Sequence, residues 1–147
     1  MRIRDIMTIY PVRIHIDATL HHAAELISLS NTSELMVIDD EKNFLGVLSE
    51  GDIIRAMLPN FDEILAAGGS LHDAFTYFIH KGSELAQRPI APLVITNAII
   101  LMPDDEAAIA ATTMIEKQIR RLPVVENGKL VGTLSRSDIC RAVVYGL

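Results

Sequence analysis

The sequence predicts a mixed α/β (α+β) fold built from two similar β-α-β-β-α units with a helical insert between them. The first indication is internal repetition, since GVLSEGDIIRA at 46–56 and GTLSRSDICRA at 132–142 agree at seven of eleven positions. The second is that strand-period and helix-period apolar patterns follow one another in the same order in both halves. The third is a central stretch that has no counterpart in either half.

The first copy, residues 1–58, opens its regular structure with a strand. Val12, Ile14 and Ile16 alternate with polar residues, as a half-buried strand requires. The positions 20, 23, 24 and 27 are apolar and fall on one face of a helix, where alanines allow close approach to a sheet. Two apolar strands follow, and the second of them runs into a helix at Ser49.

The second copy, residues 90–147, repeats this pattern at an offset of 87 residues. Ala107, Ala110 and Met114 reproduce the helix spacing, and Asn127-Gly128 predicts a tight primed hairpin turn. The first copy has the longer polar turn DDEKN at this place, which reduces the offset to 86 afterwards. We therefore expect strand, helix, strand, strand and helix again, with a first strand that includes Ile99 and Ile100.

The insert, residues 59–89, is expected to be helical. Pro59 stops the preceding helix, FDEILAA can form a short helix, and Ser70 can cap a second one. Four of the seven aromatic residues of the chain lie here. Two interpretations stand side by side: the second helix packs on its own chain, or its apolar face docks a second subunit. The face in question carries Leu71, Ala74, Phe75 and Phe78.

Composition narrows the class of protein. Half of the 147 residues are hydrophobic and 22% are charged, as in an ordinary globular protein. The net charge of −6 argues against nucleic acid as a partner, and no apolar run is long enough for a membrane span. A single cysteine, Cys140, permits no internal disulfide, and the histidines lack metal-ligand spacing. Without a secretory signal at the N-terminus, the expected location is the cytoplasm.

Both copies resemble the cystathionine β-synthase (CBS) domain, a β-α-β-β-α repeat that occurs in tandem. The resemblance rests on DIMT at 5–8, the Asp-initiated helix at 17–27, LPVV at 122–125 and Gly-x-Leu-Ser-x-x-Asp in both copies. It covers nearly all of the chain except the insert. It implies two repeats packed sheet to sheet as a pseudo-twofold pair, with two clefts that commonly bind adenosine-containing ligands, and frequent dimerisation.

The resemblance places such a ligand beside the two Ser-x-x-Asp motifs. A carboxylate that is held outward can accept a hydrogen bond from each of two adjacent ribose hydroxyls, a role expected of Asp138 and Asp52. A serine at the strand-to-helix junction can reach a sugar or phosphate oxygen. Gly46 and Gly132 remove a side chain where the strand passes close to something else.

Charge predicts that the two sites differ. Arg120, Arg121 and Arg136 surround the second motif, whereas the corresponding positions of the first copy hold Ser33, Glu34 and Glu50. A phosphate should prefer the arginines. The expected main nucleotide site comprises Ser135, Asp138, Arg136, Arg121, Arg120, Pro123, Ile99, Ile100 and Gly132, and the expected weaker site comprises Ser49, Asp52, Val12, Met36 and Gly46.

The same residues have a purely structural interpretation. Ser-x-x-Asp is also the pattern of a capping box, in which serine and acid satisfy the amides at the start of a helix. The arginines could equally belong to a solvated surface. Both interpretations remain open at the level of the sequence.

The predicted function is a non-catalytic regulatory module that binds an adenine nucleotide (AMP, ADP or ATP) in the cleft between the two repeats and requires no cofactor. No nucleophile, acid-base pair or metal cluster indicates an enzyme, and an enzyme acting on nucleotides is the least favoured hypothesis. Because no effector domain follows the second motif, the output is expected to reach a partner protein in trans or a homodimer interface. Two further hypotheses are a scaffolding dimer without ligand binding and a protein that binds S-adenosylmethionine or NAD.

Overall fold

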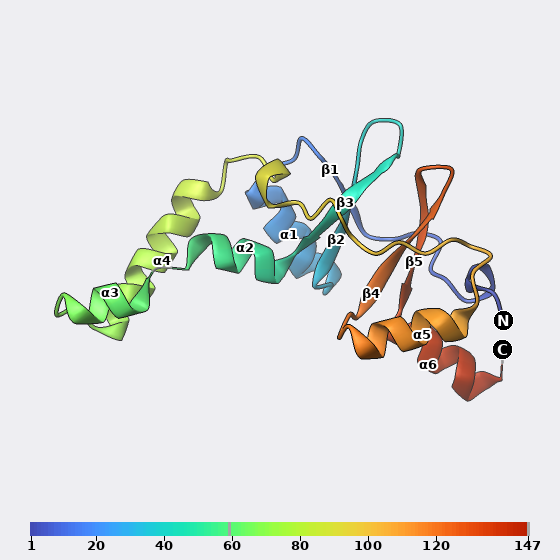
Figure 1. Ribbon diagram of the computed structural model, residues 1–147. Coiled ribbons are helices and arrows are strands. Elements are labelled where there is room, and N and C mark those ends of the chain that lie inside the picture. Colours follow the sequence, from blue (N-terminus) through green and yellow to red (C-terminus); the bar gives the residue numbers. More distant parts are fainter. Residues whose placement is uncertain (59, 147) are drawn as a thin grey trace.

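The first copy folds in the predicted order of strand, helix, strand, strand and helix in the computed structural model, which describes residues 1–58 and 60–146 (Figure 1). Its three strands form one sheet in the order β1-β2-β3, with β1 parallel and β3 antiparallel to β2. The elements are η1 (Ile3–Asp5), β1 (Arg13–His15), α1 (Leu20–Ser30), β2 (Glu34–Ile38), β3 (Phe44–Ser49) and α2 (Glu50–Met57).

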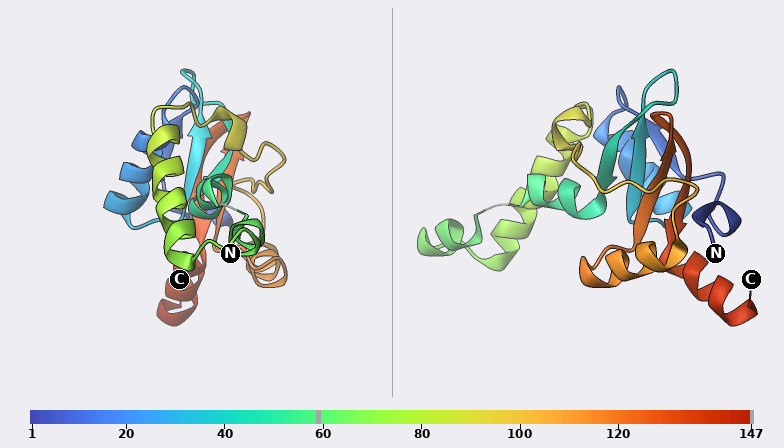
Figure 2. Two further views of the ribbon diagram at one scale, coloured as in Figure 1. Left: turned by 90° about the vertical axis from the view of Figure 1, so that its left-hand side faces the viewer. Right: turned by 45° about the vertical axis from the view of Figure 1, so that its right-hand side comes forward.

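The second copy contains the predicted helices and the predicted hairpin. Asn127 and Gly128 adopt φ values of 53° and 77°, as the primed turn requires. The antiparallel strands β4 and β5 make a 2-stranded sheet that stands beside the sheet of the first copy (Figures 1 and 2). The elements are η2 (Ala91–Leu93), α5 (Ala107–Glu116), β4 (Arg121–Glu126), β5 (Lys129–Ser135) and α6 (Arg136–Tyr145).

The first strand predicted for the second copy, around Ile99 and Ile100, is not formed. A single parallel bridge between Leu101 and Val124 takes its place. In the first copy the amide of Met36 donates to the carbonyl of Val12 at 3.3 Å. The residue that corresponds to Met36 is Pro123, which has no N–H, so this ladder hydrogen bond cannot form and the strand shrinks to one bridge.

The segment before the first strand position of each copy, residues 3–8 and residues 90–95, is called its leading segment here, and it completes the core of the other copy. Ile3 and Ile6 are buried with Leu122, Leu134 and other residues of the second copy. Conversely, Ile90 is buried in the cluster that contains the core residues of the first copy, and Leu93 and Val94 pack against that cluster. The boundaries 1–58 and 90–147 therefore divide the sequence into copies but do not divide the hydrophobic cores.

Each leading segment crosses a strand of the other copy at a glycine. Thr8 and Thr133 exchange backbone hydrogen bonds of 2.9 and 3.0 Å beside Gly132, and Val47 and Ile95 exchange the equivalent pair beside Gly46. A Cβ on Gly132 would lie 2.7 Å from the carbonyl oxygen of Thr8. The close approach predicted for both glycines is thus confirmed, and the neighbour is the backbone of the other copy.

The two sheets are tied together at the end that carries the hairpin turns. Asn43 and Lys129 form a bridge, and the Lys129 ammonium donates to the carbonyl of Glu41 at 2.8 Å. The amide of Phe44 also donates to the carbonyl of Gly128 at 2.9 Å. The opposite ends of the strands, where β2 and β4 begin and β3 and β5 enter their helices, carry the two Ser-x-x-Asp motifs.

The insert forms two helices, α3 (Phe61–Ala66) and α4 (Leu71–Leu85), as predicted; Pro59 lies outside the described residues. Ser70 caps α4 in a capping box with Asp73. The C-terminal half of α4 lies against α2, where a Cβ on Gly82 would be 3.0 Å from the Met57 sulfur. The other end of α4, together with α3, extends away from both sheets (Figures 1 and 2).

Candidate functional site

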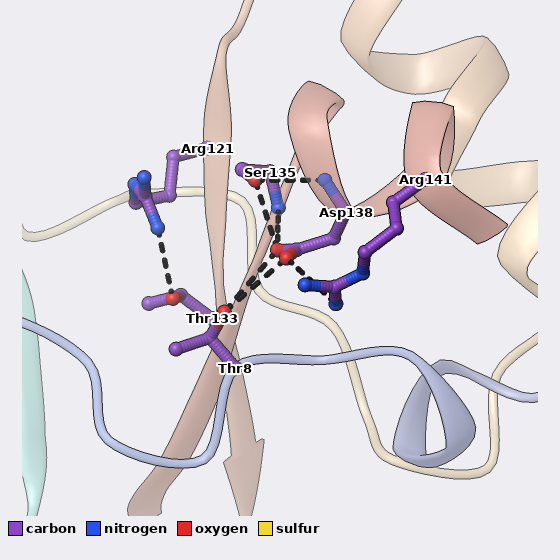
Figure 3. A network of polar contacts seen from close by, with 6 residues as sticks. All are labelled: Thr8, Arg121, Thr133, Ser135, Asp138 and Arg141. Carbon is purple, nitrogen blue, oxygen red and sulfur yellow. Dashed lines mark hydrogen bonds and ion pairs between the residues drawn. The ribbon is translucent and has the colours of Figure 1, made fainter.

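Ser135 and Asp138 form a capping box at the start of α6 (Figure 3). The Ser135 hydroxyl accepts a hydrogen bond from the Asp138 amide at 3.1 Å. In return Oδ2 of Asp138 accepts from the Ser135 amide at 2.8 Å and from the Ser135 hydroxyl at 2.9 Å. The structural interpretation of this motif is therefore confirmed, and the carboxylate faces its own helix start and not outward.

The second oxygen of the Asp138 carboxylate is held less closely. Oδ1 lies 3.3 Å from the hydroxyl of Thr8 and 3.4 Å from a guanidinium nitrogen of Arg141 (Figure 3). The residue is only 5% exposed. The capping box thus occupies one oxygen of a buried carboxylate, while the other has two long contacts, one of them from the leading segment of the first copy.

Asp52 is arranged similarly but is bound more tightly by a cation. The Ser49 hydroxyl accepts from the Asp52 amide at 3.1 Å and donates to Oδ2 at 2.7 Å. Oδ1 accepts from Arg55 at 2.6 Å. Partial burial acts to raise the pKa of the Asp52 carboxyl, but hydrogen bonds from Ser49 and Arg55 outweigh it, so this pKa lies below its usual range. A ligand would have to displace a short ion pair here.

A cleft of about 300 Å³ opens beside Ser135 and is lined by both copies. The first copy contributes residues 31–34, which are the loop 31–33 between α1 and β2 and the first residue of β2. The second contributes Arg120 and Arg121 at the start of β4 and residues 135–137 at the junction of β5 and α6. The residues predicted for the main site all belong to the second copy, and the structure adds residues of the first copy to the lining of this cleft between the repeats.

A second cleft, of about 480 Å³, lies beside Ser49. Its lining includes Glu50 and Arg55 of the first copy and residues 118–120 of the second. Ser33, Glu34 and Arg120 line both clefts, so the two hollows adjoin one another across the junction of the copies. Glu50 lines only this second cleft, and Arg121 and Arg136 line only the first, so the second is the more acidic one, as the sequence predicts.

The three arginines predicted for the main site differ in their contacts. Arg121 reaches the buried Thr133 hydroxyl with Nη1 at 3.3 Å, and Arg120 lines both clefts. Arg136 instead donates to the carbonyls of Met114 and Ile119, both at 3.0 Å, at the C-terminal end of α5. Its side chain borders the cleft while its guanidinium stabilises the end of a helix.

The apolar residues predicted to line an adenine slot do not line these two clefts. Met36 and Pro123 are buried within β2 and β4, and Val12 lies half-buried beside Met36. Ile99 and Ile100 are 39% and 48% exposed on the extended segment that precedes Leu101. Of the predicted site residues, these two clefts are therefore lined by the polar ones, namely serines and arginines at the starts of strands and helices.

Three features of the site were not predicted from the sequence. Residues 31–34 carried no motif, Thr133 occupies a variable position of the repeated phrase, and Thr8 lies 130 residues before the carboxylate that it contacts. The one signal in the sequence is that Thr8 of the first copy corresponds to Ile95 of the second, so only the first copy has a hydroxyl at this position. That this hydroxyl contacts Asp138 follows only once it is known that each leading segment crosses the other copy.

The CBS domain model matches residues 3–59 and residues 90–145. The chain belongs to the CBS domain family. Each match corresponds to one copy, so the chain is a tandem CBS pair, and the resemblance predicted from the sequence is confirmed. CBS pairs are typically regulatory modules.

Relatives and solved structures agree with this assignment. The uncharacterised protein MJ1225 of Methanocaldococcus jannaschii is 24% identical over 139 residues, 95% of this chain, and the chain spans only 41% of that protein. The crystal structure of CBSX2 of Arabidopsis thaliana in complex with AMP superposes with a TM-score of 0.74 at 24% identity, covering 98% of this chain and 96% of CBSX2. The CBS pair of MJ0100, crystallised with methylthioadenosine and S-adenosylmethionine, has a TM-score of 0.68 at 19% identity, covering 100% and 98%.

The described residues show neither a membrane span nor a cluster of metal ligands. Over residues 1–58 and 60–146, none of the helices has the length and apolar character to cross a membrane. Over the same residues, no three side chains among His, Cys, Asp and Glu come together in a way that could hold a metal ion.

Proposed function

We propose that this CBS pair is a regulatory module that binds an adenine nucleotide in the cleft beside Ser135. The observation that carries the proposal is the composition of this cleft, which is lined by Arg120, Arg121 and Ser135. The buried Asp138 is hydrogen-bonded to Ser135 but is not itself among the lining residues. The AMP bound in CBSX2 and the adenosyl ligands of MJ0100 support an adenosine-containing ligand in this fold.

The phosphate end of the ligand has the better defined partners. Arg121 and Arg120 carry the cations that a phosphate requires, and arginine can offer two parallel donors to its oxygens. The start of α6 adds amides with the polarity that favours an anion. The phosphate would take up the guanidinium of Arg121, which now contacts Thr133 at the long distance of 3.3 Å.

The ribose would bind Asp138 through its second oxygen. Oδ2 can stay in the capping box while Oδ1 exchanges the long contacts with Thr8 and Arg141 for ribose hydroxyls. The same exchange at Asp52 would break the 2.6 Å contact with Arg55. The cleft beside Ser135 is therefore the proposed main site for two reasons: its arginines attract a phosphate, and Oδ1 of Asp138 is held by weaker contacts than Oδ1 of Asp52.

Transmission of the signal would follow from the shared lining of the cleft. Since residues 31–34 and residues 120–121 belong to different copies, a ligand that contacts both favours one relative arrangement of the two repeats. A homodimer interface or an effector protein in trans would respond to this shift. No step of this mechanism requires catalysis or a cofactor.

The cleft beside Ser49 favours a second class of adenosyl ligand. Glu50, which lines only this cleft, repels a phosphate but accepts an uncharged nucleoside or a cationic sulfonium group. S-adenosylmethionine and methylthioadenosine, the ligands of MJ0100, have this chemistry. We therefore propose that any occupant of this cleft is an adenosyl compound without phosphates.

The proposal is tested by a melting-temperature screen with AMP, ADP, ATP, NAD, S-adenosylmethionine and methylthioadenosine. A ligand at one hundred times its dissociation constant adds about 2.7 kcal/mol to the free energy of unfolding, which is readily measured. Absence of a shift with all six compounds would reject ligand binding and favour a scaffolding role.

Matched variants assign the site. Asp138→Asn and Asp52→Asn both keep an oxygen that can accept the serine amide, so both should retain the capped helix. We expect Asp138→Asn to weaken AMP binding about tenfold or more and Asp52→Asn to change it less than about twofold, measured by titration calorimetry. Equal losses would contradict the asymmetry of the two sites.

A further inference from the structure

The helical insert encloses a hollow of about 360 Å³ where it joins the first copy. The C-terminal half of α4, the start of α1, the last turn of α2 and η2 surround this hollow, which is called the insert cavity (Figures 1 and 2). Six of its lining residues are alanine, leucine or proline, and the other two are Lys81 and Arg88. The insert cavity shares no lining residue with the two Ser-x-x-Asp clefts.

Backbone hydrogen bonds hold the end of the insert against the start of α1 and so fix the walls of the cavity. The amide of Leu20 donates to the carbonyl of Arg88 at 2.9 Å. The next amide, that of His21, donates to the carbonyl of Ala86 at 2.8 Å. The insert thus satisfies amides that the first turn of a helix leaves without partners, and the segment that carries Arg88 is held in place.

The duplicated fold provides an internal comparison for this cavity. Ala56 of the lining corresponds to Ala142 in the second copy, and Leu93 corresponds to Ile6. Ala142 and Ile6 are 2% and 4% exposed, so the second copy is closed at these positions. Ala56 is exposed and Leu93 is only half-buried. The hollow is therefore not a requirement of the repeat but a feature of the copy on which the insert lies.

The charges of the lining are all positive, although the chain as a whole has a net charge of −6. Across residues 1–58 and 60–146, neither Lys81 nor Arg88 forms an ion pair, and Lys81 is half-buried. Glu84, which also lies on α4, pairs instead with His80 at 3.1 Å. Two cations without partners beside one hollow favour an anion.

The apolar part of the lining determines what the rest of such an anion must be. Leu85 lies one turn after Lys81 on the same face of α4, so atoms next to an anion held by Lys81 would lie against a leucine. The volume lies within the range of small-molecule sites. At about 30 Å³ for each water-sized group, it accommodates on the order of ten non-hydrogen atoms. This size suits a small molecule and excludes a folded partner.

We propose that the insert cavity binds a small amphipathic anion, which has an apolar chain or ring and one carboxylate, with the carboxylate between Lys81 and Arg88. The apolar part lies against the leucines and prolines, where its removal from water stabilises the complex. A neutral apolar molecule would leave both cations without a partner, and a highly polar molecule would lose its hydration against these walls. An occupant contacts the insert and the first copy together and so stabilises the position of α4.

Octanoate serves as the probe in titration calorimetry and melting-temperature measurements on the full chain. We expect a dissociation constant on the order of 1 mM or lower and a rise in Tm. Octanol has the apolar chain without the charge, and acetate has the charge without the chain, so each should bind at least about tenfold more weakly. An unchanged Tm with octanoate, or equal affinity for octanol, would overturn the proposal.

Substitution of the two cations tests the position of the carboxylate. Lys81→Gln and Arg88→Gln should each weaken octanoate binding about fivefold, because each removes one charged contact. Lys117→Gln is the matched control, since this lysine is exposed and lies outside the cavity. Its affinity for octanoate should equal that of wild type. Wild-type affinity in both cavity variants would place the carboxylate elsewhere and contradict the proposal.

Ala56→Phe tests the cavity itself, because the larger side chain occupies the hollow from α2 while both cations remain. Octanoate affinity should fall at least about tenfold, with an unchanged circular dichroism spectrum because Ala56 is exposed. Phe75→Ser removes a 58% exposed ring from the other end of α4 and should bind octanoate like wild type. The opposite pattern, a loss in Phe75→Ser alone, would place the apolar chain on the open face of α4 and reject the cavity.

The response to AMP separates this proposal from the nucleotide proposal. Because the cavity and the two clefts share no lining residue, AMP-induced melting shifts should be the same in Lys81→Gln, Arg88→Gln and Ala56→Phe as in wild type. The same shifts also show that the variants are folded. Failure of octanoate binding and failure of nucleotide binding are therefore recognised independently.

Discussion

The two Ser-x-x-Asp motifs share one structural role, and in both an arginine three residues further on contacts the aspartate, but the strength of that contact and the other neighbours differ. Both cap a helix with nearly the same hydrogen bonds between serine and aspartate. Oδ1, the oxygen outside the capping box, has two long contacts in Asp138, one of them with Thr8. In Asp52 the same oxygen forms a 2.6 Å contact with Arg55. Capping therefore explains why the motif is present twice, while ligand chemistry depends on residues outside the motif.

The largest expected effect concerns the glycines at which the copies cross. A Cβ on Gly46 would meet the carbonyl of Ile95 and lie 2.7 Å from a Val94 methyl group, whereas on Gly132 it would meet the Thr8 carbonyl and the flexible Met7 side chain. We expect Gly46→Ala to lower the free energy of unfolding by about 2–3 kcal/mol, and Gly132→Ala by about 1–2 kcal/mol.

Urea denaturation of both glycine variants measures these effects. Gly51→Ala is the matched control, because its Cβ would meet only the mobile end of Arg55 and it lies within α2, where alanine is favoured. A destabilisation of Gly51→Ala as large as that of Gly46→Ala would show that the crossing contacts are not responsible.

The next effect separates the arginines of the main site. Arg121→Ala should weaken AMP binding about tenfold, equivalent to about 1.4 kcal/mol, and leave adenosine binding nearly unchanged, because only AMP carries the phosphate. Arg136→Ala should lower stability through lost contacts with the end of α5 and alter both affinities alike. Titration calorimetry with AMP and with adenosine measures the ratio of the two affinities in each variant. If Arg121→Ala weakens both ligands equally, the phosphate lies elsewhere.

A smaller effect concerns the hydroxyl that only the second site possesses. Thr8→Val preserves the shape of the residue but removes a donor to the buried Asp138, so we expect a loss of about 1 kcal/mol in unfolding free energy. Ile95→Val, at the equivalent crossing of the other copy, is 44% exposed in the parent chain and should cost clearly less. Equal costs would mean that the Thr8 hydroxyl contributes nothing.

The smallest effect is the acid dependence that Asp52 confers. Since its folded pKa is lowered, its stabilisation is present above the unfolded pKa of about 3.9 and disappears as the pH falls below it. The stability difference between wild type and Asp52→Asn should be under about 1 kcal/mol at pH 6 and should shrink between pH 5 and pH 3. Urea unfolding at each pH measures this difference. A difference that does not change with pH would exclude the carboxylate charge as its source.

The sequence was most informative where structure depends on local pattern. The helices at 20–30 and 107–116, the turn at Asn127-Gly128 and the capped helix after Ser70 all follow from periodicity, positive-φ preference and capping chemistry. The repeated phrase located both Ser-x-x-Asp motifs. It could not tell capping from ligand binding, because both uses require the same two residue types at the same spacing.

The remaining differences arise from contacts between distant segments. Pro123 shortens a strand through the hydrogen bond it cannot donate to the segment around Ile99. Arg136 is directed away from the cleft by two carbonyls, one in the last turn of α5 and one just after that helix, which come together only in the folded chain. The contribution of residues 31–34 to the cleft depends on how the two copies meet. None of these follows from residue type or spacing alone.

The crossing of the leading segments has a consequence for the chain as a product of duplication. A polypeptide that held one copy alone would lack the neighbour that fills its core, as Ile3 and Ile90 now do for each other's copies. Two such polypeptides could satisfy each other only by exchanging their first residues. In its cores the molecule is therefore equivalent to two single copies that have exchanged their leading segments and are joined by the insert, and copies produced separately should regain the native structure only when mixed.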